Sequence, residues 1–201
     1  QYIADFNKTL EKHDLFCVHY AHAGSGELHL RPIINLKTKD GNELFRQILQ
    51  DIAELVKKYK GSLSGEHGDG RLRGEFIPFM IGEKNYELLR RIKQTWDPMK
   101  VFNPGKITDT PPMNKQLRYR PGQRTLQYDT AFNFDTYQGI LRTAELCNGS
   151  GDCRKTHLSG GTMCPSYMAT KDEKDTTRAR ANMFREVLTN ELDEKNPFDN
   201  E

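Results

Sequence analysis

Two histidines that flank a glycine-rich turn, and a glutamate and a histidine in a second glycine-rich segment, are the residues best suited to chemistry. His22 and His29 lie on either side of Gly24-Ser25-Gly26, and Glu66 directly precedes His67. If the turn is centred between Ser25 and Gly26, His22 and His29 are equidistant from its centre, and a hairpin would set them directly opposite each other. Opposed Cβ atoms lie ~4.5–5.5 Å apart, which is close enough for two imidazoles to share a metal ion.

Glu66 could add a carboxylate to the two imidazoles, which would make a two-histidine, one-carboxylate metal site with open positions. If the second segment is extended, neighbouring side chains point apart, so His67 would act beside the metal as a base or an acid. A structural alternative stays open for the same residues. A histidine on a half-buried strand is usually only hydrogen-bonded, and a glycine-rich segment can be a plain turn.

Hydrophobic periodicity predicts the elements that must position these residues. Apolar residues at helical spacing predict three helices, over 2–12, 42–60 and 84–96. The predicted helix over 84–96 should bury one face, which consists of Leu88, Leu89, Ile92 and Trp96. Strand-like segments predict a hairpin and a third short strand, over 15–21, 27–35 and 62–64. This order of elements predicts an α+β domain with a small antiparallel sheet and helices on one face.

Charge and hydropathy exclude two classes of protein. The chain has 201 residues, and 30 Lys and Arg nearly cancel 28 Asp and Glu, which leaves a formal net charge of +2. A nucleic-acid-binding protein would be expected to carry a large cationic excess. The longest apolar stretch, residues 76–81, is far shorter than the ~20 residues that span a bilayer. We therefore expect neither a nucleic-acid partner nor a transmembrane segment, and the start at Gln1 suggests a piece of a longer protein.

The composition changes after residue 107. Residues 109–133 contain three prolines and little periodicity, so we predict a linker there. Beyond it, we expect a helix over 135–146 and a last helix capped by Asp175.

Three clustered thiols lie in this second part of the chain, at Cys147, Cys153 and Cys164. In a chain without a secretory signal, clustered thiols more often bind metal than form disulfides. A cytoplasmic setting is therefore expected, with peripheral membrane attachment left open.

Three motifs resemble the C-terminal domain of FAD-linked oxidases, the family of D-lactate dehydrogenases, glycolate oxidase subunits and D-2-hydroxyglutarate dehydrogenases. They cover roughly residues 1–108 and lie at 22–29, 64–68 and 96–107. In that family the two hairpin histidines and the glutamate bind a divalent metal, usually zinc. The next histidine is the base, and an Asn-Pro-Gly-Lys segment approaches the flavin. The resemblance implies five roles: metal ligands at His22, His29 and Glu66, the base at His67 and a flavin contact at Asn103.

The chain departs from the family pattern around the second histidine. Ser25 and Glu27 replace the Asp and Asn that are common between the two histidines. Arg31 stands two residues after His29 and on the same strand face, where its guanidinium could clamp a substrate carboxylate. An exposed charge at a sheet edge is the other interpretation of Arg31.

The cysteine segment resembles the first cysteine motif of two-cluster ferredoxin domains, as in the ferredoxin-like region fused behind the FAD-linked oxidase in large bacterial oxidoreductases. Cys147, Cys153 and Cys164, the last followed by Pro165, carry this resemblance, although Ser150 occupies the second cysteine position. It implies a 4Fe-4S cluster in the full-length protein. For the chain itself, an incomplete cluster, a zinc site completed by a histidine and free thiols all stay open.

Together the resemblances imply a fragment of a large FAD-dependent D-2-hydroxyacid dehydrogenase. Residues 1–108 would be the substrate cap, 109–133 the linker and 134–201 a partial, mostly helical iron–sulfur region. The expected partners are a small 2-hydroxyacid, the FAD domain and the remaining iron–sulfur domain of the parent chain. The fragment alone should be inactive. The chain has no glycine-rich dinucleotide-binding fingerprint ahead of a helix, so NAD is not an expected cofactor. Two alternatives remain, a metal-dependent hydrolase and a redox-inert interaction module.

Overall fold

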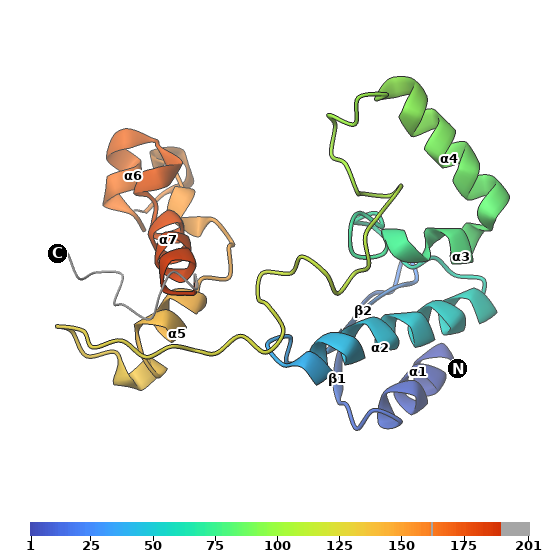
Figure 1. The fold of residues 1–201 in the computed structure, drawn as a ribbon, viewed down its shortest axis with the longest axis horizontal. Helices are drawn as coiled ribbons and strands as arrows, with labels where there is room; N and C mark the ends of the chain where they lie inside the picture. Colours follow the sequence, from blue (N-terminus) through green and yellow to red (C-terminus); the bar gives the residue numbers. More distant parts are fainter. Residues whose placement is uncertain (162, 190–201) are drawn as a thin grey trace. The chain divides into compact units, whose positions relative to one another are not determined.

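The chain divides into two compact units. Figure 1 shows a computed structural model of the protein, which describes residues 1–161 and 163–189. The first unit comprises residues 1–123 and the second begins at residue 124.

The first unit is an α+β domain, as expected. Its helices are α1 (Tyr2–Glu11), α2 (Lys39–Lys58), α3 (Ile77–Ile81) and α4 (Glu83–Trp96), with one 3₁₀ turn, η1 (Gly74–Phe76). Its sheet is an antiparallel hairpin of β1 (Cys17–His22) and β2 (Glu27–Pro32). The predicted third strand over 62–64 is wrong, because the Ser62 hydroxyl donates to the Ser64 carbonyl at 3.0 Å and bends the chain there.

The hairpin register differs from the expected one by two residues. Tyr20 lies opposite His29, and His22 lies opposite Glu27. The connection is a four-residue turn in which the Ser25 N–H donates to the His22 carbonyl at 3.0 Å. The expectation that His22 directly faces His29 is therefore wrong. Because side chains alternate with a period of two, the shift of two residues still leaves both histidines on one face.

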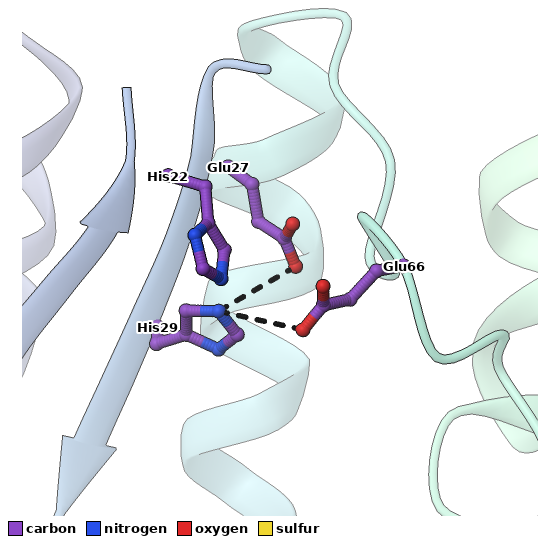
Figure 2. A group of neighbouring side chains, drawn as sticks. All are labelled: His22, Glu27, His29 and Glu66. Atoms are coloured by element: carbon purple, nitrogen blue, oxygen red, sulfur yellow. Dashed lines mark ion pairs between the residues drawn. The ribbon is translucent and has the colours of Figure 1, made fainter. Parts of the chain in front are cut away.

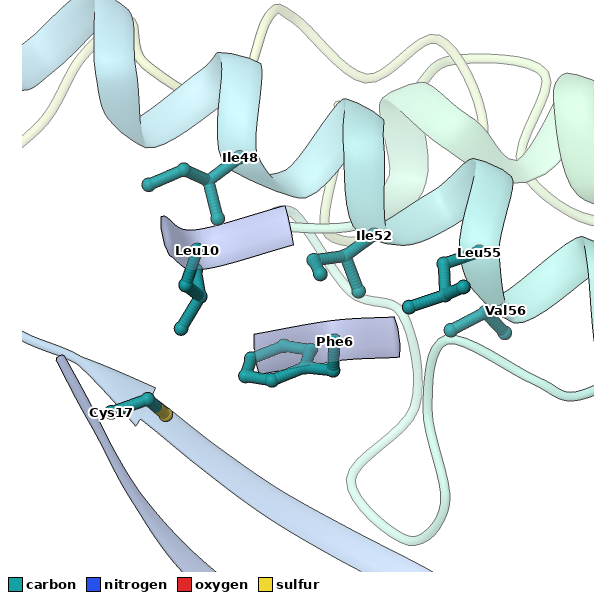
Figure 3. Packing of buried hydrophobic residues seen from close by; sticks show 7 residues of the cluster. All are labelled: Phe6, Leu10, Cys17, Ile48, Ile52, Leu55 and Val56. Carbon is teal, nitrogen blue, oxygen red and sulfur yellow. The ribbon is translucent and has the colours of Figure 1, made fainter. Parts of the chain in front are cut away.

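Helix α2 packs its apolar face against α1 and one face of the hairpin. The Thr38 hydroxyl begins the helix by accepting the Gly41 N–H at 3.0 Å. Figure 3 shows the resulting cluster, which comprises Phe6, Leu10, Cys17, Ile48, Ile52, Leu55 and Val56. Each fully buried aliphatic or aromatic side chain in such a cluster contributes about 1.5–3 kcal/mol. This packing fixes the position of the hairpin along the axis of α2.

A second cluster ties residues 108–116 to the first unit. Met113 is only 1% exposed and packs against Ala53 of α2 and Phe76 of η1. Asn42 and Asn114, both buried, exchange two hydrogen bonds of 3.0 and 3.1 Å. The first part of the expected linker therefore packs on the core of the unit instead of being solvated.

Helix α4 does not bury the face that its periodicity predicts. Leu88 is 48% exposed, Ile92 58% and Trp96 80%. Figure 1 shows α4 projecting away from α2, with α3 at its base. The prediction of a buried face is wrong for the described part of the chain, because these three side chains are largely exposed there.

The second unit is built from short helices. They are η2 (Asp135–Tyr137), α5 (Ile140–Glu145), η3 (Asp152–Arg154), η4 (His157–Ser159), α6 (Pro165–Thr170), η5 (Glu173–Asp175) and α7 (Thr177–Thr189). The predicted helix over 135–146 begins only at residue 140, because Gln138 and Gly139 have φ values of 62° and 105°. The cap of α7 is Thr176, not Asp175: its hydroxyl accepts the Ala179 N–H at 2.9 Å. In the described part of the chain, no helix has both the length and the apolar character needed to cross a membrane.

The burial of Met113 can be tested by comparison with a matched exposed methionine. Met113→Ala should lower the free energy of unfolding by about 2–5 kcal/mol, because it leaves a cavity between α2 and η1. Met99→Ala, at a position 81% exposed, should change it by less than about 0.5 kcal/mol. Urea unfolding followed by circular dichroism measures both. Equal losses would contradict the packing described for residues 108–116.

Candidate metal centre

Four side chains with metal-ligating atoms converge on one face of the hairpin. His22, Glu27 and His29 come from the strands and Glu66 from the loop between α2 and η1, and one ligand atom of each lies within 4.8 Å of the others. The two imidazole rings are 4.9 Å apart and nearly perpendicular. Figure 2 shows both carboxylates pointing toward His29, whose Nε2 is 3.5 Å from Glu66 Oε1 and 3.8 Å from Glu27 Oε1. Across residues 1–161 and 163–189, this is the one such group of three or more ligands.

The alternation of the strands sets the direction of these side chains. Cys17 and Leu30 lie on the hairpin face that packs on the helices. His22, Glu27 and His29 lie on the other face. Glu27 is the site residue that the sequence interpretation missed as a ligand. Its position two residues before His29 was the available signal, since residues i and i+2 of a strand share a face.

The loop that carries Glu66 is fixed at both ends. Leu63 packs against the apolar face of α2, and the Arg73 guanidinium donates to the Gly68 carbonyl at 2.8 Å. At Gly65 a Cβ atom would lie 2.7–2.8 Å from the Glu27 side chain, so a larger residue there would push that side chain aside. The loop therefore sets Glu66 beside Glu27.

His67 lies beside the metal-ligating group without being a member of it. Its Nε2 is 2.6 Å from Glu66 Oε1, and its side chain is 76% exposed. The condition under which the two neighbouring side chains would point apart, an extended segment, is not met, because the loop bends at these residues. The His67 ring thus lies within hydrogen-bonding distance of Glu66 and is open to solvent.

A cavity of about 890 Å³ opens next to the metal-ligating residues. Glu27, His29, Arg31 and Arg73 supply its charged lining, and apolar side chains of α2 supply much of the rest. The Arg31 guanidinium lies 5.5 Å from the centre of the Tyr20 ring. Such a cavity can admit a small carboxylic acid, with cationic groups at its walls.

Asn103 belongs to a separate loop that Asp97 organises. The Asp97 carboxylate accepts the N–H groups of Val101 and Phe102 at 2.8 and 3.0 Å and the Lys93 ammonium at 2.6 Å. These donors, Lys93 first, hold the pKa of Asp97 below its ordinary value. Asn103 has a φ of 47°, and its amide oxygen accepts from Lys106 at 3.0 Å. Among the described residues, Asn103 is part of neither the metal-ligating group nor the cavity lining.

Two of the three clustered cysteines are buried together. Cys153 and Cys164 pack with Tyr167, while Cys147 is half-buried. The backbone N–H of Tyr167 and then the Thr177 hydroxyl lower the pKa of the Cys164 thiol. In the described part of the second unit, the three thiols do not form a group whose sulfur atoms all lie within reach of one metal ion.

The first unit matches a known protein family. Residues 1–107 match the family described as FAD linked oxidases, C-terminal domain. The chain belongs to this family. The resemblance of its three motifs to the C-terminal domain of FAD-linked oxidases is thereby confirmed.

Relatives of this FAD-linked oxidase domain extend the match beyond residue 107. D-2-hydroxyglutarate dehydrogenase of Pseudomonas putida is 36% identical over 190 residues, which cover 93% of this chain and 18% of the relative. The Escherichia coli protein of the same name is 33% identical over 187 residues, with the same coverage. The glycolate oxidase subunit GlcD of Bacillus subtilis is 28% identical over 101 residues, which cover 50% of this chain and 22% of the relative. No solved structure matches.

The lowered pKa of Asp97 makes a testable contribution to stability. The carboxylate should stabilise the fold above its unfolded pKa of ~3.9, and this contribution should be lost as the pH falls through the lower folded value. Asp97→Asn should therefore unfold at a lower temperature than wild type at pH 7, and the difference should shrink below about pH 4. Thermal unfolding followed by circular dichroism measures it, with exposed Asp129→Asn as the control. A difference that is independent of pH would contradict the role of the charge.

Proposed function

We propose that the chain is the substrate cap of an FAD-dependent D-2-hydroxyacid dehydrogenase, followed by part of an iron–sulfur region. The observation that carries the proposal is the group of two histidines and two glutamates within a FAD-linked oxidase domain. The matched relatives named D-2-hydroxyglutarate dehydrogenase and D-lactate dehydrogenase support a 2-hydroxyacid as the substrate. The chain spans only 18% of the first of these relatives, so the activity would be that of a longer protein.

His22, His29 and Glu66 are the residues proposed to hold a divalent metal ion. Two imidazole nitrogens and a carboxylate oxygen within 4.8 Å of one another suit zinc and other divalent first-row transition metals. When bound, the ion would make a substrate hydroxyl group more acidic and offset the charge of the substrate carboxylate. This fit of the donor set supports the metal assignment.

His67 is proposed to take the hydroxyl proton at a ring nitrogen. Its exposed ring next to Glu66 supports this role, because the carboxylate stabilises the imidazolium that forms. Arg31, at the wall of the cavity, is proposed to bind a substrate carboxylate. FAD, when bound, would accept the α-hydrogen with its electron pair. The oxidation is then balanced, with the proton on His67 and the product a 2-oxoacid.

Most of the FAD is proposed to bind a domain outside this chain, with Asn103 as one contact from this side. The exposed apolar surface of α4 and the loop after it supports such a neighbour, because this surface continues up to Asn103. Its members are Leu88, Ile92, Trp96, Met99, Val101 and Phe102. A surface of this kind is usually covered by a partner.

The second unit is proposed to contribute Cys147, Cys153 and Cys164 to a 4Fe-4S cluster in the full-length protein. The joint burial of Cys153 and Cys164 supports this, and so does the position of Arg178. Its pKa is raised first by its hydrogen bond to Glu173 and also by Cys153 and Cys147, so both thiols lie near one cation. A cluster spreads its ligands over several irons and so does not need thiols that share one ion. The division into a cap (1–108), a linker (109–133) and an iron–sulfur region (134–201) is part of the proposal.

Two variants should separate the two metal sites. In protein purified without oxygen, His22→Ala should lose about one zinc or manganese ion per chain and keep its iron. Cys153→Ser should lose iron and keep the other metal. Elemental analysis measures all three metals, and each variant is the control for the other. Metal contents that neither variant changes would contradict both ligand assignments and favour a redox-inert module.

The role of His67 is tested in the full-length flavoprotein. His67→Gln should slow flavin reduction by a D-2-hydroxyacid about 10²–10⁴-fold, because the hydroxyl proton loses its acceptor. Metal content should stay that of wild type, since His67 is not a proposed ligand. Anaerobic stopped-flow absorbance of the flavin measures the rate. Reduction at the wild-type rate would rule out His67 as the base.

A further inference from the structure

Glu27 occupies the position of a metal ligand. It lies directly opposite His22 in the hairpin, and its Oε1 is 3.8 Å from Nε2 of His29. Its side chain is 12% exposed, compared with 39% for Glu66. Its carboxylate is thus the more deeply buried of the two.

The Glu27 side chain lies against Gly65 of the loop that carries Glu66. The glycine backbone lies so close to the Glu27 side chain that a Cβ atom would come within 2.8 Å of Cγ, Cδ and Oε1. The two carboxylates therefore approach the same space from the hairpin and from the loop.

The negative charges of Glu27 and Glu66 lie close together, and a bound cation would offset them. Glu27 and Glu66 bring carboxylate oxygens within 4.8 Å of each other. Among the described residues, their ion pairs are with His29 and His67, and neither has a Lys or Arg partner. Like charges this close repel, and a divalent ion between them would offset both.

We infer that Glu27 is a fourth protein ligand of this centre and that it selects a six-coordinate ion of the Mn²⁺ type over tetrahedral zinc. The inference rests on the proposed metal centre. Four protein donors would fill the coordination sphere of tetrahedral zinc, whereas an octahedral ion keeps two positions for the hydroxyl and carboxylate oxygens of a 2-hydroxyacid. A second carboxylate also suits Mn²⁺ better than zinc, because harder ions prefer oxygen ligands.

Equilibrium dialysis of the full chain against Mn²⁺ alone and Zn²⁺ alone tests the inference. In Glu27→Gln the ratio of the Mn²⁺ to the Zn²⁺ dissociation constant should rise at least about tenfold. Glu27→Asp, which keeps the charge, should recover part of the ratio. Glu54→Gln removes an exposed glutamate of α2 and should leave it unchanged. Circular dichroism checks that each variant is folded.

The outcomes separate this inference from the proposed function. If wild type binds both ions and the ratio stays the same in Glu27→Gln, the role of Glu27 is overturned while the metal centre stands. If wild type binds neither ion, both are overturned. A raised ratio in Glu27→Gln that Glu27→Asp partly restores supports the inference.

Discussion

The packing of α2 is the constraint on which the rest of the first unit depends. Ile48 and Ile52 bury the side of the helix that faces α1 and the hairpin, while Ala53 packs with Phe76 and Met113. Leu63, at the start of the Glu66 loop, contacts both clusters. A single rigid helix therefore holds the hairpin and the loop, and it sets the distance between them. Two segments about forty residues apart in sequence meet because both are anchored on α2.

The metal-ligating group depends on this anchoring because it is not stable by electrostatics alone. Two carboxylates in close proximity repel each other, and ordinary side-chain freedom would separate them. The packing of Leu63 and the hydrogen bond from Arg73 to the Gly68 carbonyl hold the loop, and with it Glu66, close to the hairpin. The energy that keeps the carboxylates together comes from apolar burial elsewhere in the unit. A divalent ion would then meet ligands that are already in position, as proposed above.

The first unit is a family domain that leaves part of its apolar surface exposed. Residues 1–107 belong to the FAD-linked oxidase C-terminal domain, and the chain spans 18% of its first two relatives named here. Within the described residues, a two-stranded sheet and an uncovered helix α4 leave much apolar surface in contact with solvent. A sheet of two strands needs packing partners for stability, and α2 supplies those on one face only. The metal-ligating residues lie on the other face, next to the cavity.

Much of this architecture could be predicted from sequence, because periodicity and glycine spacing report local structure directly. The hairpin, α1, α2 and α4 follow from such patterns, and residue types alone suggested His22, His29 and Glu66 as candidate ligands. Only the tertiary structure decided the two-residue register shift that puts Glu27 opposite His22, since the turn geometry and the packing on α2 set it. It also decided the burial of Met113 and the exposure of Trp96. A sequence pattern shows which face of an element is apolar, but burial depends on what the rest of the chain brings to that face.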